Sequence, residues 1–503
     1  MRLPWLVLAL LFMLNAGCLR PVPLRDEWVM SEVLHRYNDF FPAPSTQTPR
    51  AGLLRPRFGV PAIAQTGAAF PLELLEQSGG PSLRAALLAP DASPEESVRC
   101  LSGEHSPQCS LLSLVEKDRR PMSPQAAWVL YEARPSFALS PGGYDFVLSD
   151  GKSEFQRSPQ AVWFRNDNPE TLSTLRVAHL SDLHVGKGDN RHSAEILARL
   201  FQVITEVNLQ QPDLVVVTGD LVHRGQISGM QFGAQQVLRH VRAPVLVILG
   251  NHDIEFGLFR APVRRYGAGW VHFARAFHPF LHFSVSLGGY DFVGFDSGPA
   301  VRSFRILTRG LHRDSLDTLA ADLNQAADKG RKGVVMFSHA PSRAALTKTF
   351  RPMGAGFFGR MDQGRAEFER LLIEGGRRGL QVLHLAGHTH WSDVFDLVPE
   401  GRRLNFRPWR DLSPCLRPLR TPVGIVTTQA ASHAGVSGKT NARGYGFSVI
   451  ELGGHVPRVA TVQHVSSRAT ECAQNGAIVL SNTSAAFPSG KPRRPSASPS
   501  GAF

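Results

Sequence analysis

Short apolar runs recur along the chain from residue 176 onwards, and each ends in polar residues. The runs span residues 176–181, 213–218, 245–249, 333–338 and 381–386. Runs of this length, rich in Val, Ile and Leu, predict buried strands. Between them, apolar residues at helical spacing predict helices at 193–209, 229–241, 314–329 and 363–375. The alternation of strands and helices predicts an α/β fold.

The preceding part of the chain has a β pattern. Ala126–Ala133 predicts a strand, and Phe137–Ser140 and Tyr144–Ser149 flank a Pro-Gly-Gly turn, which predicts a hairpin. We therefore expect a small all-β sandwich of immunoglobulin or fibronectin type over residues 56–165. A second hairpin is predicted for His282–Leu287 and Tyr290–Asp296.

The ends of the chain have other compositions. Residues 19–55 are Pro-rich and polar, which predicts a linker with one short helix near Asp26–Arg36. The tail, residues 488–503, is of low complexity and is expected to be disordered.

The first 18 residues have the features of an export signal. Arg2 precedes a short apolar stretch, which ends in Asn15-Ala16-Gly17-Cys18. The stretch is too short to span a bilayer but suits a signal-peptide core. Small residues before a cysteine resemble the bacterial lipobox, in which the cysteine, here Cys18, is lipidated. We expect a lipid-anchored protein of the bacterial cell envelope, at the outer membrane or in the periplasm, with secretion as the alternative.

The remaining cysteines agree with export. Cys100, Cys109, Cys415 and Cys472 form an even set, as expected in an oxidising compartment. Local pairing would give Cys100–Cys109 and Cys415–Cys472, although four cysteines permit three connectivities.

The net charge of the chain suggests a class of binding partner. The net charge is +13 and the pI is near 10. This suggests an anionic partner, namely a phosphorylated small molecule, an anionic lipid surface or nucleic acid. No specific nucleic-acid recognition is expected, because no motif for it is present. A solvated basic surface is an equally good explanation, and no protein partner is indicated.

The residues that follow the apolar runs suit a metal centre. Open α/β sheets place reactive groups beyond the carboxyl ends of strands. The candidates are Asp182, His184, Asp220, Asn251, His339, His388 and His390. Residues two apart at an extended strand end face the same side, as in Asp182 and His184. Imidazole and oxygen donors without thiolate favour Mn, Fe or Zn.

Taken together, the motifs resemble those of the calcineurin-like metallophosphoesterase superfamily. They read D-x-H at 182, G-D-x-x-x-R at 219, G-N-H-D at 250, His339 and G-H-x-H at 387, in the superfamily's order. The resemblance implies a double β-sheet sandwich flanked by helices (α-β-β-α), over residues 175–466. It also implies two metal ions, in a branch close either to bacterial cyclic-nucleotide phosphodiesterases or to purple acid phosphatases.

The resemblance also assigns roles by position. Asp182, His184, Asp220 and His390 would bind the first metal, and Asp220, Asn251, His339 and His388 the second. His252 would contact phosphate and protonate the leaving group, and Arg224 would clamp phosphate. The chain departs from the superfamily's phosphatases at His223, where those enzymes have an Asp that orients the catalytic histidine. Asp253 is a candidate to compensate. From their positions, His223 is a candidate to support the ligands or to be an extra ligand, and His433 is a candidate to contact substrate.

These residues predict a phosphoric ester hydrolase that acts on a phosphodiester or phosphomonoester outside the cytoplasm. Two cations would activate a water to hydroxide for attack on phosphorus, with His252 as the acid. A phosphorylated small molecule or a lipid is the expected substrate. The alternative is a catalytically weak, metal-containing lipoprotein that acts as a scaffold, which the departure at His223 favours.

Overall fold

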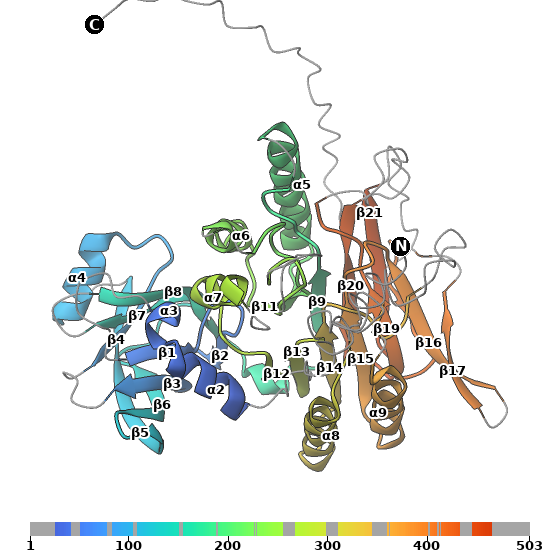
Figure 1. Ribbon diagram of the computed structural model, residues 1–503, viewed down its shortest axis with the longest axis horizontal. Coiled ribbons are helices and arrows are strands. Elements are labelled where there is room, and N and C mark those ends of the chain that lie inside the picture. The colour runs from blue at the N-terminus through green and yellow to red at the C-terminus, as the bar shows by residue number, and fades with distance from the viewer. Residues whose placement is uncertain are drawn as a thin grey trace, which may run out of the picture.

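The predicted apolar runs become strands of two sheets that face each other (Figure 1). The structure is a computed structural model. It describes residues 26–464, with gaps at 42–50, 78–82, 104–107, 150–153, 188–189, 226, 228, 255–266, 298–309, 345–359, 362, 401–402, 410–411, 413 and 433–444.

One sheet has six strands in the order β11-β10-β9-β20-β21-β18. The strands are β9 (Leu175–Leu180), β10 (Leu214–Val217), β11 (Val245–Val247), β18 (Arg417–Pro418), β20 (Tyr445–Leu452) and β21 (Arg458–His464). Strands β9, β10 and β11 are parallel to one another. Their carboxyl ends therefore meet at one edge of the sheet.

The other sheet has seven strands in the order β12-β13-β14-β15-β19-β16-β17. They are β12 (His282–Leu287), β13 (Tyr290–Phe295), β14 (Gly333–Ser338), β15 (Gln381–Ala386), β16 (Asp393–Glu400), β17 (Arg403–Pro408) and β19 (Val423–Thr427). Strands β13, β14, β15 and β19 are parallel. The predicted hairpin at 282–296 is confirmed as the antiparallel pair β12 and β13.

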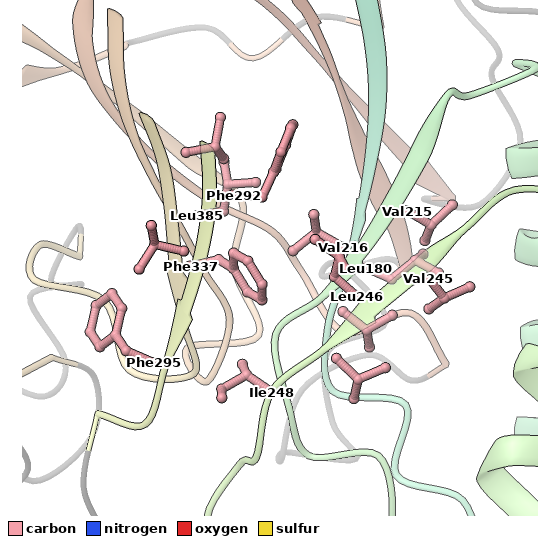
Figure 2. Packing of buried hydrophobic residues seen from close by; sticks show 14 of the residues in the cluster. Leu180, Val215, Val216, Val245, Leu246, Ile248, Phe292, Phe295, Phe337 and Leu385 are labelled. Carbon is pink, nitrogen blue, oxygen red and sulfur yellow. The ribbon is translucent and has the colours of Figure 1, made fainter. Parts of the chain in front are cut away.

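Apolar side chains from both sheets fill the space between them. Leu180 and Leu246 of the six-stranded sheet belong to the same buried cluster as Phe337 and Leu385 of the seven-stranded sheet (Figure 2). All four are at most 1% exposed. Burying each such side chain stabilises the fold by roughly 1.5–3 kcal/mol. The shared core holds the two sheets in fixed register, and with them the groups at their strand ends.

Helices pack on the sheets and on one another. They are α5 (Asn190–Leu209), α6 (Met230–Leu238), α7 (Gly267–Ala276), α8 (Arg313–Asp328) and α9 (Arg365–Arg377). Helix α5 contacts β20, whereas α8 and α9 contact strands of the seven-stranded sheet. The predicted α/β double-sheet sandwich is confirmed.

An all-β region precedes this sandwich. Its strands are β1 (Ala51–Arg55), β2 (Ala62–Gln65), β3 (Phe70–Gln77), β4 (Arg84–Leu88), β5 (Cys109–Ser123), β6 (Ala126–Pro135), β7 (Gly142–Ser149) and β8 (Glu154–Arg165). They are hydrogen-bonded in the order β1-β3-β6-β5-β4-β7-β8-β2. The long strand β5 pairs with both β6 and β4 and so joins two halves of four strands. A short helix, α4 (Pro94–Ser102), is tied to β5 by a disulfide between Cys100 and Cys109.

Two predictions for this region need correction. The hairpin predicted across Pro141-Gly142-Gly143 is wrong, because residues 137–140 form no strand and β7 pairs with β4 and β8. The short helix predicted near Asp26–Arg36 is confirmed as α2 (Asp26–His35), but the predicted linker at 19–55 also contains α3 (Tyr37–Phe40) and strand β1. Buried apolar residues such as Val33 and Phe40 explain why this segment is ordered.

The ends of the chain fall outside the description. The predicted leader with Cys18 and the predicted tail at 488–503 lie outside the described residues, as does Cys472. Cys415 is disulfide-bonded, and its pairing with Cys472 stays a prediction. Within the described ranges, none of the helices combines the length and apolarity that a membrane-spanning helix requires.

The two regions are joined by backbone pairing as well as by the short 3-10 helix η1 (Pro169–Thr171). Gly59 forms a parallel bridge with Leu246 at the edge strand β11, and Val247 N donates to Gly59 O at 3.0 Å. This pairing covers an edge that would otherwise expose unpaired backbone groups. At the same strand, the fully buried His278 donates through Nε2 to the carbonyl oxygen of Val247 at 2.8 Å. Arg57 donates to Arg275 O, at the end of α7.

The buried His278 predicts a specific acid sensitivity. Burial, opposed by its hydrogen bond to Val247 O and reinforced by the neighbouring Arg57, lowers the pKa of His278 from 6.5 to about 3. Between these pH values only the unfolded chain binds the proton, so the free energy of unfolding falls as pH falls from 6.5 towards 3. One such proton corresponds to a slope of up to about 1.4 kcal/mol per pH unit.

We expect His278→Asn to lose stability at pH 7 but to have a shallower pH dependence below pH 6.5. Urea unfolding at several pH values measures both effects. The exposed His455 provides the control, because His455→Asn should keep the slope of the unsubstituted protein. An unchanged slope in His278→Asn would contradict the assignment of a buried neutral imidazole.

Candidate metal centre

The predicted ligands follow the carboxyl ends of strands from both sheets. Asp182 and His184 follow β9, Asp220 follows β10 and Asn251 follows β11. From the facing sheet, His339 follows β14, and His388 and His390 follow β15. The structure thus brings all seven residues to one edge of the sandwich.

The backbone at this edge is unusual. Among the described residues, seven non-glycine positions have a positive φ angle, and five of them are candidate ligands. These five are Asp182, His184, Asp220, His388 and His390, with φ between 48° and 68°. The left-handed conformation costs roughly 1–2 kcal/mol for residues other than glycine. Such strain concentrates at functional sites, where the surrounding structure holds it in place.

Glycines in the motifs allow the strand ends to approach closely. A methyl group at Gly250 would overlap the backbone and carboxylate of Asp220. A methyl group at Gly387 would overlap the hydroxyl of Ser181 and crowd the carboxylate of Asp182. Both glycines are therefore required by the contact between neighbouring loops.

One group of donor atoms is formed by Asp182, His184 and His390. His390 Nε2 lies 3.0 Å from Asp182 Oδ1 and 3.3 Å from His184 Nε2. His184 Nε2 lies 3.7 Å from Asp182 Oδ1. These are the first-metal residues of the sequence prediction, apart from the shared Asp220.

A second group is formed by Asp220, His339 and His388, and Asn251 adjoins it. His339 Nε2 lies 3.3 Å from Asp220 Oδ2, 3.2 Å from His388 Nδ1 and 3.1 Å from Asn251 Oδ1. The nitrogen of His388 that faces the group is therefore Nδ1.

Asp220 lies between the two groups. Its Oδ2 is 3.3 Å from His339 Nε2 and 3.7 Å from His184 Nε2, whereas its Oδ1 accepts from His252 N at 2.7 Å. Donor atoms around a cation with bonds of about 2.1 Å are themselves roughly 3.0–3.4 Å apart. The observed spacings match or slightly exceed this range, so the residues present fit two metal ions with Asp220 as the shared ligand.

Hydrogen bonds outside the donor groups fix the ligands. Asp182 Oδ2 accepts from Ser181 Oγ at 2.6 Å and from His388 N at 2.9 Å, so Oδ1 is left facing the imidazoles. His339 Nδ1 donates to Thr218 O at 2.7 Å, so Nε2 points inward. Partners of this kind set the orientation and tautomer of metal ligands. Sequence reasoning missed Ser181 and Thr218, because a serine or a carbonyl beside a motif has no distinctive pattern.

The charges of the site suit cation binding. Burial alone would raise the pKa of Asp182, but the imidazole of His390 and hydrogen bonds from His184 and His390 hold it well below its usual range. Burial would also raise the pKa of Asp220, but the imidazoles of His339 and His252 hold it well below its usual range. Burial lowers the pKa of His184 to about 3. Ionised carboxylates and neutral imidazoles are the states that bind metals.

His252 lies beside the donor groups. Its ring is 4.8 Å from that of His184, and its Nδ1 is 2.9 Å from the carbonyl oxygen of His223. A carbonyl only accepts a hydrogen bond, so Nδ1 carries the proton in this contact. The orienting contact thus comes from the backbone of His223, whose side chain differs from the Asp of related phosphatases. The His223 ring stacks on His252 at 5.1 Å.

The other candidates differ in their surroundings. The fully buried carboxylate of Asp253 accepts from Val222 N, Gly250 N and Gln231 Nε2, so its described contacts position the loops rather than His252. Arg224 is exposed next to His223, and its role as a phosphate clamp stays a prediction. His433 lies outside the described residues.

Comparisons with known proteins agree with the family resemblance of the sequence motifs. The family model described as calcineurin-like phosphoesterase matches residues 175–392. A probable cyclic nucleotide phosphodiesterase of Rhodopseudomonas palustris is 33% identical over 108 residues, which cover 20% of this chain and 39% of that protein. An uncharacterized metallophosphoesterase of Campylobacter jejuni is 24% identical over 203 residues, or 40% and 48% of the two chains. A glycerophosphodiester phosphodiesterase of Enterobacter lignolyticus is 37% identical over 83 residues, or 16% and 30%.

The chain thus spans less than half the length of these curated relatives. The segment that the family model matches nevertheless contains every predicted metal ligand, from Asp182 to His390. Residues 175–392 form a domain of the calcineurin-like phosphoesterase family.

Proposed function

We propose that the protein hydrolyses phosphoric esters, and phosphodiesters in particular, at a binuclear metal centre. The observation that carries the proposal is the position of Asp220 between two donor groups, with His252 at their side. The names of two relatives, a cyclic nucleotide phosphodiesterase and a glycerophosphodiester phosphodiesterase, favour a diester over a monoester. The proposed substrate is a small molecule or a lipid that carries such an ester.

The residues divide the chemistry between them. Bound metal ions would supply Lewis acidity towards phosphoryl oxygens and would lower the pKa of a coordinated water. Asp182 and Asp220 provide the negative charge that retains such ions, and the neutral imidazoles complete the ligand set. Nitrogen and oxygen donors without thiolate favour Mn, Fe or Zn.

His252 is assigned the proton transfer. With Nδ1 held by the carbonyl of His223, Nε2 can donate a proton to the leaving alkoxide when the ring is protonated. Arg224 is exposed and adjacent to His223, and a guanidinium group can bind phosphate in a bidentate manner. The backbone contact to His252 supports the hydrolase over the scaffold alternative, because the substitution at His223 leaves the acid oriented.

The metal-loaded protein should release nitrophenol from bis-p-nitrophenyl phosphate faster than from p-nitrophenyl phosphate. Asp220→Asn should lower both the bound metal and the turnover, because the neutral amide is a weak bridging ligand. Elemental analysis and steady-state kinetics measure these effects. Absence of hydrolysis of either ester by protein with two bound metals would overturn the proposed activity.

A second substitution tests whether His252 is a general acid or a metal ligand. His252→Ala should reduce kcat by about 10²–10⁴-fold, the usual contribution of a general acid, and leave the metal content unchanged. His455→Ala, at an exposed position, is the matched control and should keep full activity. Loss of metal from His252→Ala would show instead that this residue is a ligand.

We also propose that the protein is exported and anchored in the bacterial cell envelope through lipid on Cys18. The sequence Asn15-Ala16-Gly17-Cys18 after a short apolar stretch supports this location. The disulfide between Cys100 and Cys109 is also consistent with an oxidising compartment.

Cys18→Ser should move the protein from the membrane fraction to the soluble fraction, because the acyl anchor is lost. Cell fractionation with immunoblotting measures the distribution, and metabolic labelling with a fatty acid detects the anchor directly. Equal membrane association of both forms, without label on the unsubstituted protein, would exclude lipidation at Cys18.

A further inference from the structure

Strands β16 and β17 lie on the side of the sandwich remote from the all-β region (Figure 1). Residues of these strands line a basic pocket. It has a volume of about 510 Å³ and lies where β16 and β17 of one sheet adjoin β18 of the other. We call it the arginine–tryptophan pocket and define it by Asp396, Arg407, Trp409, Arg417 and Arg420. None of these residues belongs to the candidate metal centre.

The pocket and the metal centre lie at different positions along the strands of the seven-stranded sheet. Asp393 pairs with Thr427, which also pairs with Ala386, the last residue of β15 before the metal-binding motif. Asp396 pairs with Gly424, three rows further from that end. At 3.3–3.4 Å per residue, three rows correspond to about 10 Å. A ligand in the pocket therefore contacts residues other than those that hold the metals.

The pocket has an excess of positive charge. Three guanidinium groups line it, against the single carboxylate of Asp396. Asp396 is only 1% exposed and lies 3.9 Å from Arg420 Nε, whereas the side chain of Arg420 is 69% exposed. Arg407 is paired with Glu400. Within the part of the chain that the structure describes, no carboxylate forms an ion pair with Arg417.

The pocket is built from fixed groups. Asp396 Oδ2 accepts from Trp409 Nε1 at 2.5 Å, and Asp396 Oδ1 accepts from Arg420 N at 3.1 Å. Trp409 N donates to Val394 O at 2.7 Å, which fixes the indole at the end of β17. One buried carboxylate thereby positions both the aromatic wall and the backbone of an arginine. A site whose walls are held in this way loses little conformational entropy when a ligand binds.

We propose that the arginine–tryptophan pocket binds the phosphate group of an organic phosphate. Guanidinium groups match phosphate oxygens with paired hydrogen bonds and remain charged at any physiological pH. Arg417 and Arg420 are exposed and supply these donors, and the half-buried Trp409 supplies an apolar wall for the carbon part of the ligand. This site does not depend on the metal centre or on the proposed hydrolysis. A soluble phosphate ester and a phospholipid headgroup present the same group.

The test compares Arg417→Gln/Arg420→Gln with the unsubstituted full chain. Equilibrium dialysis with labelled glycerol phosphate at constant ionic strength measures the number of sites and their Kd. We expect one site to be weakened at least about tenfold, since two charge-assisted hydrogen-bond donors are removed. Flotation with phosphatidylglycerol vesicles, and with phosphatidylcholine vesicles as reference, tests the lipid source. Loss of phosphatidylglycerol binding in the variant would identify a headgroup, and an effect on glycerol phosphate alone would identify a soluble ester.

The matched control is Arg370→Gln/Arg377→Gln, which removes two arginines that are 72% and 64% exposed on α9. This control should bind both probes as the unsubstituted protein does, because it changes net charge equally. Hydrolysis of bis-p-nitrophenyl phosphate should be unchanged in both double variants, which confirms that they are folded. Equal binding of both probes by the pocket variant and the unsubstituted protein would overturn the proposal, as would equal weakening in the control.

Discussion

The carboxylate of Asp220 is the interaction on which the site depends. Its Oδ2 faces His184 of one donor group and His339 of the other, and these histidines come from different sheets. The geometry exists only because the two sheets are held in register by their shared apolar core. The core in turn brings five non-glycine residues into left-handed conformations that an isolated peptide would avoid. The packing of the two sheets thus stabilises the strained backbone and the charged side chains at the edge that holds the candidate ligands.

The strands that precede the ligands, and the ligands themselves, could be predicted because each rests on a strong local pattern. Runs such as 333–338 and 381–386 are mostly apolar, and a motif residue follows each of them directly. The order of the motifs along the chain then identified the family.

Other features have no such local signal. The left-handed backbone at Asp182 and His388 arises from contacts between distant loops, and the carbonyl of His223 is chemically the same as any other carbonyl. The Pro-Gly-Gly sequence was misread as a hairpin because β7 finds its partners in β4 and β8, which its own sequence does not encode. The segment before Arg55 was read as a linker because it is Pro-rich and polar, and the partners of its buried residues, such as Trp270 for Phe40, are far away in sequence.

The central expectation for this site is a pair of metal ions that share one carboxylate. X-ray diffraction from crystals of the metal-loaded protein, recorded at the absorption edge of the bound element, tests this most directly. The account predicts two anomalous peaks about 3.5–4 Å apart, with the Asp220 carboxylate between them. A single peak, or two peaks that do not flank Asp220, would contradict it.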